Sequence, residues 1–111
     1  MTLGLVLGVA GAAQAEDTKQ VFDFYCAQCH GVKGDGKGIN VGKDFATDPR
    51  NFTNAADMEK RSDDDIRGVI KDGGPSISKS PLMPPWGSTL SAAQVNDLLA
   101  YIRKMCNCKA K

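Results

Sequence analysis

The stretch Cys26-Ala27-Gln28-Cys29-His30 decides how the rest of this chain is interpreted. Two cysteines three positions apart, followed at once by a histidine, form the attachment sequence of c-type haem. At the end of a helix, two such thiols can reach the vinyl groups on one edge of a porphyrin, and the histidine is then held beneath the iron. The motif therefore predicts one covalent haem c, with thioether bonds from Cys26 and Cys29 and with His30 as an axial ligand.

Two other kinds of site use similar cysteine spacings. A thioredoxin-type motif belongs to an α/β fold, and no segment here shows the sustained alternation of a strand. A zinc site would combine Cys26 and Cys29 with a second pair, Cys106 and Cys108. The Cys-Cys-His order and an export signal at the N-terminus favour haem over both.

The composition suits a small domain with a cofactor in its core. A chain of 111 residues forms a single modest domain, and its aromatic content of 6% leaves few large side chains for the interior. Small domains of this kind usually depend on a disulfide, a metal or a cofactor. The formal charge of +1 argues against a nucleic-acid partner, because no dominant basic face is available.

The N-terminus resembles a secretory signal. Residues Leu3–Ala13 are all apolar or glycine, a run too short to span a bilayer, and Ala13-Gln14-Ala15 is a small-x-small cleavage site. We expect residues 1–15 to be a signal peptide and residues 16–111 to be a periplasmic domain with no stable membrane insertion after cleavage. An uncleaved tether is the alternative, since no Lys or Arg precedes the apolar run.

The rest of the chain predicts an all-α fold, with three to four helices joined by long loops. Asp17 and Thr18 can cap a first helix that runs into Cys26, and five glycines break regular structure over Gly31–Gly42. Capping boxes predict two further helix starts, at Ser62 with Asp65 and at Ser91 with Gln94. The last helix carries an apolar face made of Val95, Leu98, Leu99, Ile102 and Met105.

The second axial ligand of the iron follows by elimination. His30 is the only histidine, which excludes ligation by two histidines of this chain and leaves Met, Lys, Tyr, water or no sixth ligand. Met58 lies in a charged run and is predicted to be a surface side chain, whereas Met105 on the apolar face is predicted to fill the core. Met83 lies in a proline-stiffened loop, Ser80–Gly87, that can press a thioether sulfur against an iron. We therefore expect Met83 to be the second ligand.

Taken together, the chain resembles the class I cytochromes c, in particular the small bacterial monohaem carriers. The resemblance rests on the order of Cys26–His30, the glycine-rich loop, the segment 49–53, the segment 83–87 and the amphipathic last helix. It implies an all-α fold around one covalent haem, with crossing first and last helices. It also implies low-spin iron held by His and Met, and one-electron transfer through a partly exposed haem edge.

The resemblance also suggests supporting roles. Pro49 would supply the backbone carbonyl that orients His30. Arg50 and Trp86 are candidates for hydrogen bonds to the haem propionates, although a solvated charge and simple packing are the alternatives. Tyr25 and Phe52 are expected to pack.

Six-coordinate iron has no open position for a substrate, so the sequence predicts an electron carrier rather than an enzyme. A peroxidase would also need a distal acid–base residue that this chain lacks. We expect a monomeric shuttle between redox proteins, such as a terminal oxidase or a reductase. The alternative is a tethered haem subunit through which electrons enter a larger respiratory complex. Lys33 and Lys37, beside the motif, can attract an acidic partner, or they are simply solvated.

Cys106-Asn107-Cys108 has no counterpart in a simple carrier of this family. The pair can form an intrachain disulfide, link two chains, or remain as free thiols. We favour the intrachain disulfide because the export signal places the protein in an oxidising compartment.

Overall fold

The computed structural model describes residues 4, 10–43, 48–74 and 83–111; helices joined by loops and turns make up these regions, and no strand occurs in them. The helices are α1 (Ala10–Tyr25), α2 (Ala27–His30), α3 (Ala55–Met58), α4 (Asp63–Asp72) and α5 (Ala92–Cys106). The all-α prediction is therefore confirmed. None of the described helices combines the length and the apolar character that a membrane span requires.

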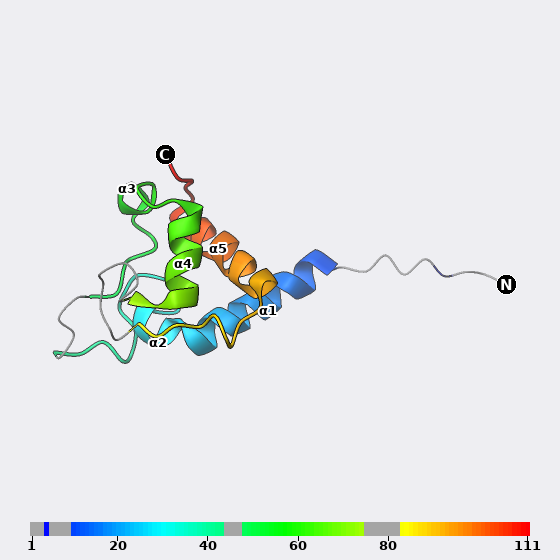
Figure 1. The fold of residues 1–111 in the computed structure, drawn as a ribbon, viewed down its shortest axis with the longest axis horizontal. Coiled ribbons are helices and arrows are strands. Elements are labelled where there is room, and N and C mark those ends of the chain that lie inside the picture. The colour runs from blue at the N-terminus through cyan, green and yellow to red at the C-terminus, as the bar shows by residue number, and fades with distance from the viewer. Residues whose placement is uncertain (1–3, 5–9, 44–47, 75–82) are drawn as a thin grey trace.

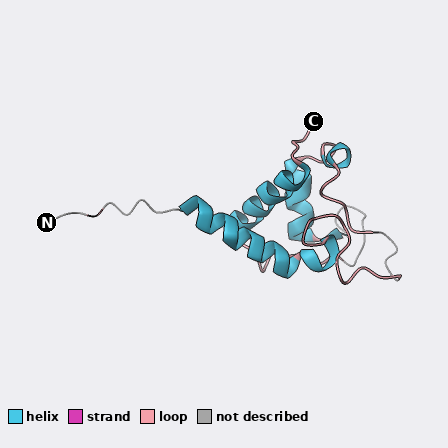
Figure 2. Ribbon diagram, turned by 180° about the vertical axis from the view of Figure 1, so that it is seen from behind, coloured by secondary structure: helices cyan, strands magenta, loops and turns pink. Residues whose placement is uncertain are grey.

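The long helices α1 and α5 cross, and α4 packs against α5 (Figures 1 and 2). Their shared core is built around Phe22 of α1 and Leu98 of α5, which are both 0% exposed. Phe22 also lies against the Tyr101 ring, with 5.1 Å between centroids. The crossing places the end of α1, where Cys26 follows, against the interior of the domain.

The two capping boxes predicted from the sequence are both present. At α5, the Ser91 hydroxyl accepts a hydrogen bond from the Gln94 amide at 3.1 Å, and the Gln94 side chain accepts one from the Ser91 amide at 2.8 Å. At α4, the corresponding distances between Ser62 and Asp65 are 3.0 and 3.3 Å. These reciprocal bonds satisfy amides that have no partner within the helix, and they fix where α4 and α5 begin.

Replacing Ser91 with alanine is expected to lower the free energy of unfolding by about 1 kcal/mol, because an amide at the start of α5 loses its acceptor. Urea denaturation of the wild-type and variant proteins measures this change. Ser88 is exposed and lies outside the helices, so Ser88→Ala serves as the control. Equal unfolding midpoints for the Ser91 and Ser88 variants would show that the cap contributes nothing.

Two parts of the helix prediction were wrong. Helix α1 begins at Ala10, so Asp17 lies inside the helix rather than at its N-cap. The residues before Asp17 are mostly alanine, the best helix former, and they extend the helix toward the N-terminus. The prediction of three to four helices also omitted the single turns α2 and α3, which are too short to show any periodicity.

The prediction of a surface position for Met58 was also wrong. Met58 is only 1% exposed and belongs to the core. The Asn54 side chain caps α3 by accepting a hydrogen bond from the Asp57 amide at 3.2 Å, and this turn packs against α5. Because α3 packs against α5, the Met58 side chain is buried between them, although charged residues surround it in the sequence. Met105 is half-buried against the core, as predicted.

Candidate functional site

The motif Cys26–His30 is folded around the single turn α2. The Cys26 amide donates to the Phe22 carbonyl at 2.8 Å, which continues the hydrogen bonding of α1, and the His30 amide donates to the Cys26 carbonyl at 2.9 Å. Both thiols, of Cys26 and of Cys29, are free and half-buried. The turn therefore presents two thiols and one imidazole within five residues at the end of α1.

The environment of the Cys26 thiol disfavours its thiolate form. Burial, with a smaller contribution from the neighbouring Cys29, raises the pKa of the Cys26 thiol to about 12. The Cys26 thiol is therefore protonated at neutral pH. Cys106 and Cys108 are joined to each other by a disulfide with an S–S distance of 2.11 Å, which confirms the intrachain pairing.

The structure does not support the zinc alternative. Within the described residues, no group of three or more His, Cys, Asp or Glu side chains is placed to hold a metal ion. The disulfide also removes two of the four sulfur ligands that such a site would need. Nor does the described part of the chain contain the strand that a thioredoxin-type motif requires.

The His30 ring is oriented by a backbone carbonyl. Its Nδ1 lies 3.1 Å from the Arg50 carbonyl oxygen. Because a carbonyl only accepts, Nδ1 must carry the proton and Nε2 keeps a free lone pair. Burial lowers the pKa of His30, although the bond to the Arg50 carbonyl opposes that effect. A neutral imidazole with a free Nε2 is the form that binds haem iron.

The prediction that Pro49 supplies this carbonyl was wrong by one residue. The Pro49 oxygen lies where Gly36 approaches, 2.6 Å from the position that a Cβ on Gly36 would occupy. The next carbonyl in the chain, that of Arg50, is the one beside His30. The Pro49 oxygen therefore lies against the glycine-rich loop, and the Arg50 oxygen lies beside the His30 ring.

The glycine-rich loop folds back over α2. The Gly36 amide donates to the His30 carbonyl at 2.7 Å, and the Gly38 amide donates to the Cys29 carbonyl at 3.0 Å. Next to these contacts, the Phe52 ring stacks on the His30 ring at 4.4 Å with an interplanar angle of 17°. Phe52 is buried, in agreement with its predicted packing role. The loop therefore holds the backbone of His30, and Phe52 holds its ring.

Met83 begins a segment that is bonded to the end of α4. Its carbonyl accepts a hydrogen bond from the Gly74 amide at 3.0 Å, and the Trp86 amide donates to the Ile70 carbonyl at 2.9 Å. The Met83 side chain is half-buried. Residues 80–82, the first part of the predicted ligand loop, lie outside the described residues.

The Trp86 ring connects the Met83 segment to the cysteine motif. It packs against the ring of Tyr25, with 4.9 Å between centroids, and Tyr25 directly precedes Cys26. The predicted packing of Tyr25 is thus confirmed. The structure brings the Met83 segment and the cysteine motif to the same end of α1. The propionate contacts of Arg50 and Trp86 stay predictions.

A family model described as "Cytochrome C oxidase, cbb3-type, subunit III" matches residues 13–102. The chain belongs to this family. It is a c-type cytochrome domain of the class I type, as the resemblance implied, and its all-helical structure agrees with that fold. A search of curated proteins found no match.

Two solved structures are similar to this cytochrome domain. One is the KustC0563 c-type cytochrome, with 26% identity and a TM-score of 0.63 over 79% of this chain and 95% of that chain. The other is the Kuenenia stuttgartiensis reducing HAO-like protein complex Kustc0457/Kustc0458, with 29% identity and a TM-score of 0.64 over 81% of this chain. The cytochrome domain spans only 41% of the matched chain in that complex.

A c-type cytochrome domain implies covalent haem c, and the residues present fit that group. The thiols of Cys26 and Cys29 are both free, as two thioether bonds require. The Nε2 atom of His30 is left without a proton by the bond from Nδ1 to Arg50. Both requirements of the attachment motif are therefore met by the structure.

Proposed function

We propose that this protein is a one-electron carrier with one haem c, bound by thioethers from Cys26 and Cys29 and ligated by His30 and Met83. The bond between His30 Nδ1 and the Arg50 carbonyl, which leaves Nε2 free for iron, is the observation that carries the proposal. The family match and the free thiols support it. The haem supplies reversible one-electron chemistry at iron when it is bound.

The protein's part in this chemistry is to hold the two axial ligands. His30 is fixed by the Arg50 carbonyl on one side and by the Phe52 ring on the other. Met83 is fixed through its backbone to Gly74, at the end of α4. Ligands held in this way would move little between the two oxidation states of a bound haem, and the Met83 thioether would raise its reduction potential relative to a second histidine. With His30 and Met83 both bound to it, the iron would have no free position for a substrate.

Carbon monoxide binding to the reduced protein tests this proposal. Six-coordinate ferrous haem with both protein ligands in place is expected to bind carbon monoxide slowly or not at all, while the protein exchanges single electrons rapidly with small inorganic couples. Rapid formation of a carbon monoxide complex by the wild-type protein would contradict ligation by Met83 and would return the open-iron enzyme to consideration.

The partners we propose are an electron donor and an electron acceptor in an exported respiratory system, with residues 1–15 acting as the signal peptide of a monomeric carrier. A tethered subunit of a larger complex is the second candidate, and one observation favours it. Helix α1 starts at Ala10 and runs unbroken through the predicted cleavage site at Ala13–Ala15. Finding residues 1–15 still present in protein purified from membranes would select the tethered form.

The surface around the motif suits transient docking. The described large apolar side chains that are most exposed are Phe24, Val32 and Ile39, at 69%, 66% and 89%, and they flank or follow α2. Lys33 and Lys37 are exposed in the same loop. Apolar side chains beside positive charges favour a short-lived complex with an acidic redox protein.

Changing Lys33 and Lys37 together to glutamine is expected to slow association with an acidic redox partner at low ionic strength by about threefold or more, because steering depends on charge near the contact. Stopped-flow oxidation of the reduced protein measures the rate. The matched control is Lys60→Gln with Lys109→Gln, which removes the same charge from exposed positions in other segments. An equal loss in both variants would show that only net charge matters.

A further inference from the structure

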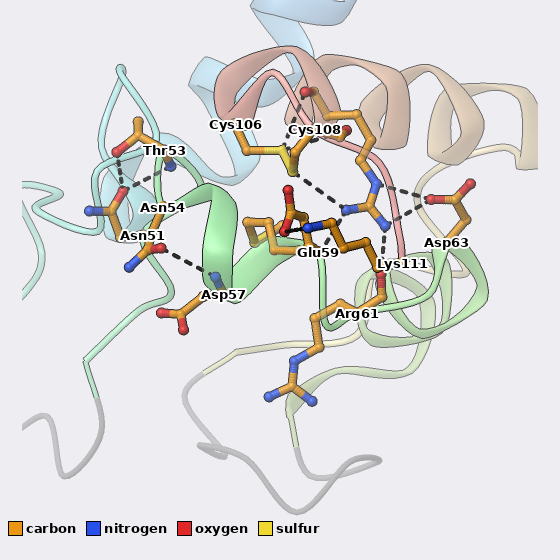
Figure 3. The surroundings of a disulfide bond; sticks show 12 residues. Asn51, Thr53, Asn54, Asp57, Glu59, Arg61, Asp63, Cys106, Cys108 and Lys111 are labelled. Carbon is orange, nitrogen blue, oxygen red and sulfur yellow. Dashed lines mark hydrogen bonds and ion pairs between the residues drawn. A yellow bond between two sulfur atoms is a disulfide. The ribbon is translucent and has the colours of Figure 1, made fainter.

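The disulfide between Cys106 and Cys108 takes no part in the proposed electron transfer. It lies at the end of α5, where Asn107 adopts a left-handed conformation with φ 49° and the two Cα atoms are 5.2 Å apart (Figure 3). A bond that closes so short a segment removes little entropy from the unfolded chain and so adds little stability. Its surroundings point to a chemical role instead.

The two sulfur atoms have unlike environments. Cys106 is only 6% exposed, and its Sγ lies 3.4 Å from the Arg103 carbonyl oxygen. A thiol there would be buried beside an acceptor, which favours the protonated form. Cys108 is half-buried, and its Sγ lies 4.0 Å from the guanidinium nitrogen Nη1 of Arg103. A thiol there would be reachable from solvent beside a positive charge, which favours the thiolate.

Arg103 is fixed in place beside Cys108. Its side chain is 12% exposed and forms an ion pair with Asp63 at 2.9 Å. It also donates to the Met58 carbonyl at 2.8 Å and to the Arg61 carbonyl at 2.6 Å. These contacts, with α3, with Arg61 and with the first residue of α4, hold the Arg103 guanidinium close to the Cys108 sulfur.

The other charged groups around the disulfide do not cancel this asymmetry. The Glu59 carboxylate is paired with the Lys111 ammonium at 3.1 Å, and Asp63 is paired with Arg103 (Figure 3). Lys104 and Lys109, on either side of the pair in the sequence, are exposed. Basic groups therefore predominate at this end of the molecule, and they favour a thiolate on the more accessible sulfur.

We propose that Cys106 and Cys108 form a thiol–disulfide exchange site for small aliphatic thiols and disulfides, with Cys108 as the exchanging sulfur and Cys106 as the resolving thiol. In the oxidised protein, an incoming thiolate attacks Cys108 Sγ. The bond between Cys106 and Cys108 breaks, a mixed disulfide forms on Cys108, and Cys106 leaves as a thiolate that takes up a proton.

A second molecule of the small thiol completes the reaction. Its thiolate attacks the outer sulfur of the mixed disulfide, and Cys108 leaves as a thiolate beside Arg103. Overall, the protein disulfide gains two electrons and two protons, and two small thiols are oxidised to one disulfide. In the reverse direction, the Cys108 thiolate attacks a small disulfide, and Cys106 then displaces the bound thiol to restore the protein disulfide. The same sulfur carries the mixed disulfide in both directions.

The single-cysteine variants Cys106→Ser and Cys108→Ser form the matched pair that tests this assignment. Each haem-loaded variant is mixed with oxidised glutathione, and the glutathione adduct is followed by intact mass. The Cys106→Ser protein, which keeps Cys108, is expected to form the adduct about tenfold faster or more, because thiolate character and access set the rate. Equal rates, or faster reaction of the Cys108→Ser protein, would overturn the proposal.

The wild-type protein supplies a test that does not depend on how the variants fold. After brief reduction by dithiothreitol, a limiting amount of iodoacetamide is expected to label Cys108 before Cys106 in a peptide map, and labelling of Cys106 first would contradict the assignment. In the Cys106→Ser background, Arg103→Gln is expected to shift the reaction to higher pH, whereas Arg103→Lys, which keeps the charge, is not. An unchanged pH profile in the glutamine variant would remove Arg103 from the site.

Discussion

Replacing Met83 with alanine is expected to lower the reduction potential by about 100 mV or more, within the range of roughly 0.8 V that axial ligands span in haem proteins. The variant loses the thioether that favours ferrous iron, and the vacated position becomes open to solvent. The reduced variant should therefore bind carbon monoxide rapidly, whereas the wild-type protein should not. Redox titration and carbon monoxide binding measure the two effects on the same sample.

Met105→Ala is the matched control for Met83→Ala. Met105 is also half-buried but packs against the core through α5. Its removal is expected to lower stability and to leave the potential and the carbon monoxide behaviour close to those of the wild-type protein. A Met83 variant with an unchanged potential, or a Met105 variant with the changed one, would mean that the second ligand has been assigned to the wrong residue.

Replacing Gly73 with alanine is expected to disturb the Met83 segment without touching its side chain. Gly73 has φ +84°, and an added Cβ would lie 2.9 Å from the Met83 carbonyl oxygen and 3.1 Å from the Pro85 nitrogen. Both neighbours are backbone atoms, so the segment itself must shift. We expect the free energy of unfolding to fall by about 1–3 kcal/mol, because alanine tolerates this backbone conformation poorly. In part of the protein, Met83 should also no longer bind the iron, which would lower the reduction potential.

Gly68 offers a control on the same helix, α4. A Cβ there would meet no atom within 4 Å. Gly68→Ala is therefore expected to preserve the haem spectrum and to raise stability slightly, by about 0.5–1 kcal/mol, through helix propensity. If Gly73→Ala left both the stability and the potential unchanged, the end of α4 would not position Met83.

Short-range chemistry explains which parts of the fold could be predicted. The capping boxes at Ser62 and Ser91 depend on residues only three positions apart, and the structure contains both. The attachment motif is equally local, since five consecutive residues place two thiols and one imidazole around the turn α2. The family match over residues 13–102 agrees with the resemblance that these motifs suggested.

The errors concern contacts between distant segments. Met58 looked like a surface residue because its neighbours are charged, yet the packing of α3 on α5 buries it. Arg50 rather than Pro49 provides the carbonyl for His30, and no local pattern encodes a contact between residues 20 positions apart in the chain. The fixed position of Arg103 beside Cys108 likewise depends on carbonyls more than forty residues away in the chain.

The central claim is that one haem c is covalently bound through Cys26 and Cys29. Intact mass under denaturing conditions, on protein matured by its own export and haem-attachment system, tests it most directly. We predict the mass of the polypeptide plus one haem that survives denaturation, and loss of that addition when both cysteines are replaced with alanine. A haem-free mass for the wild-type protein would contradict the account.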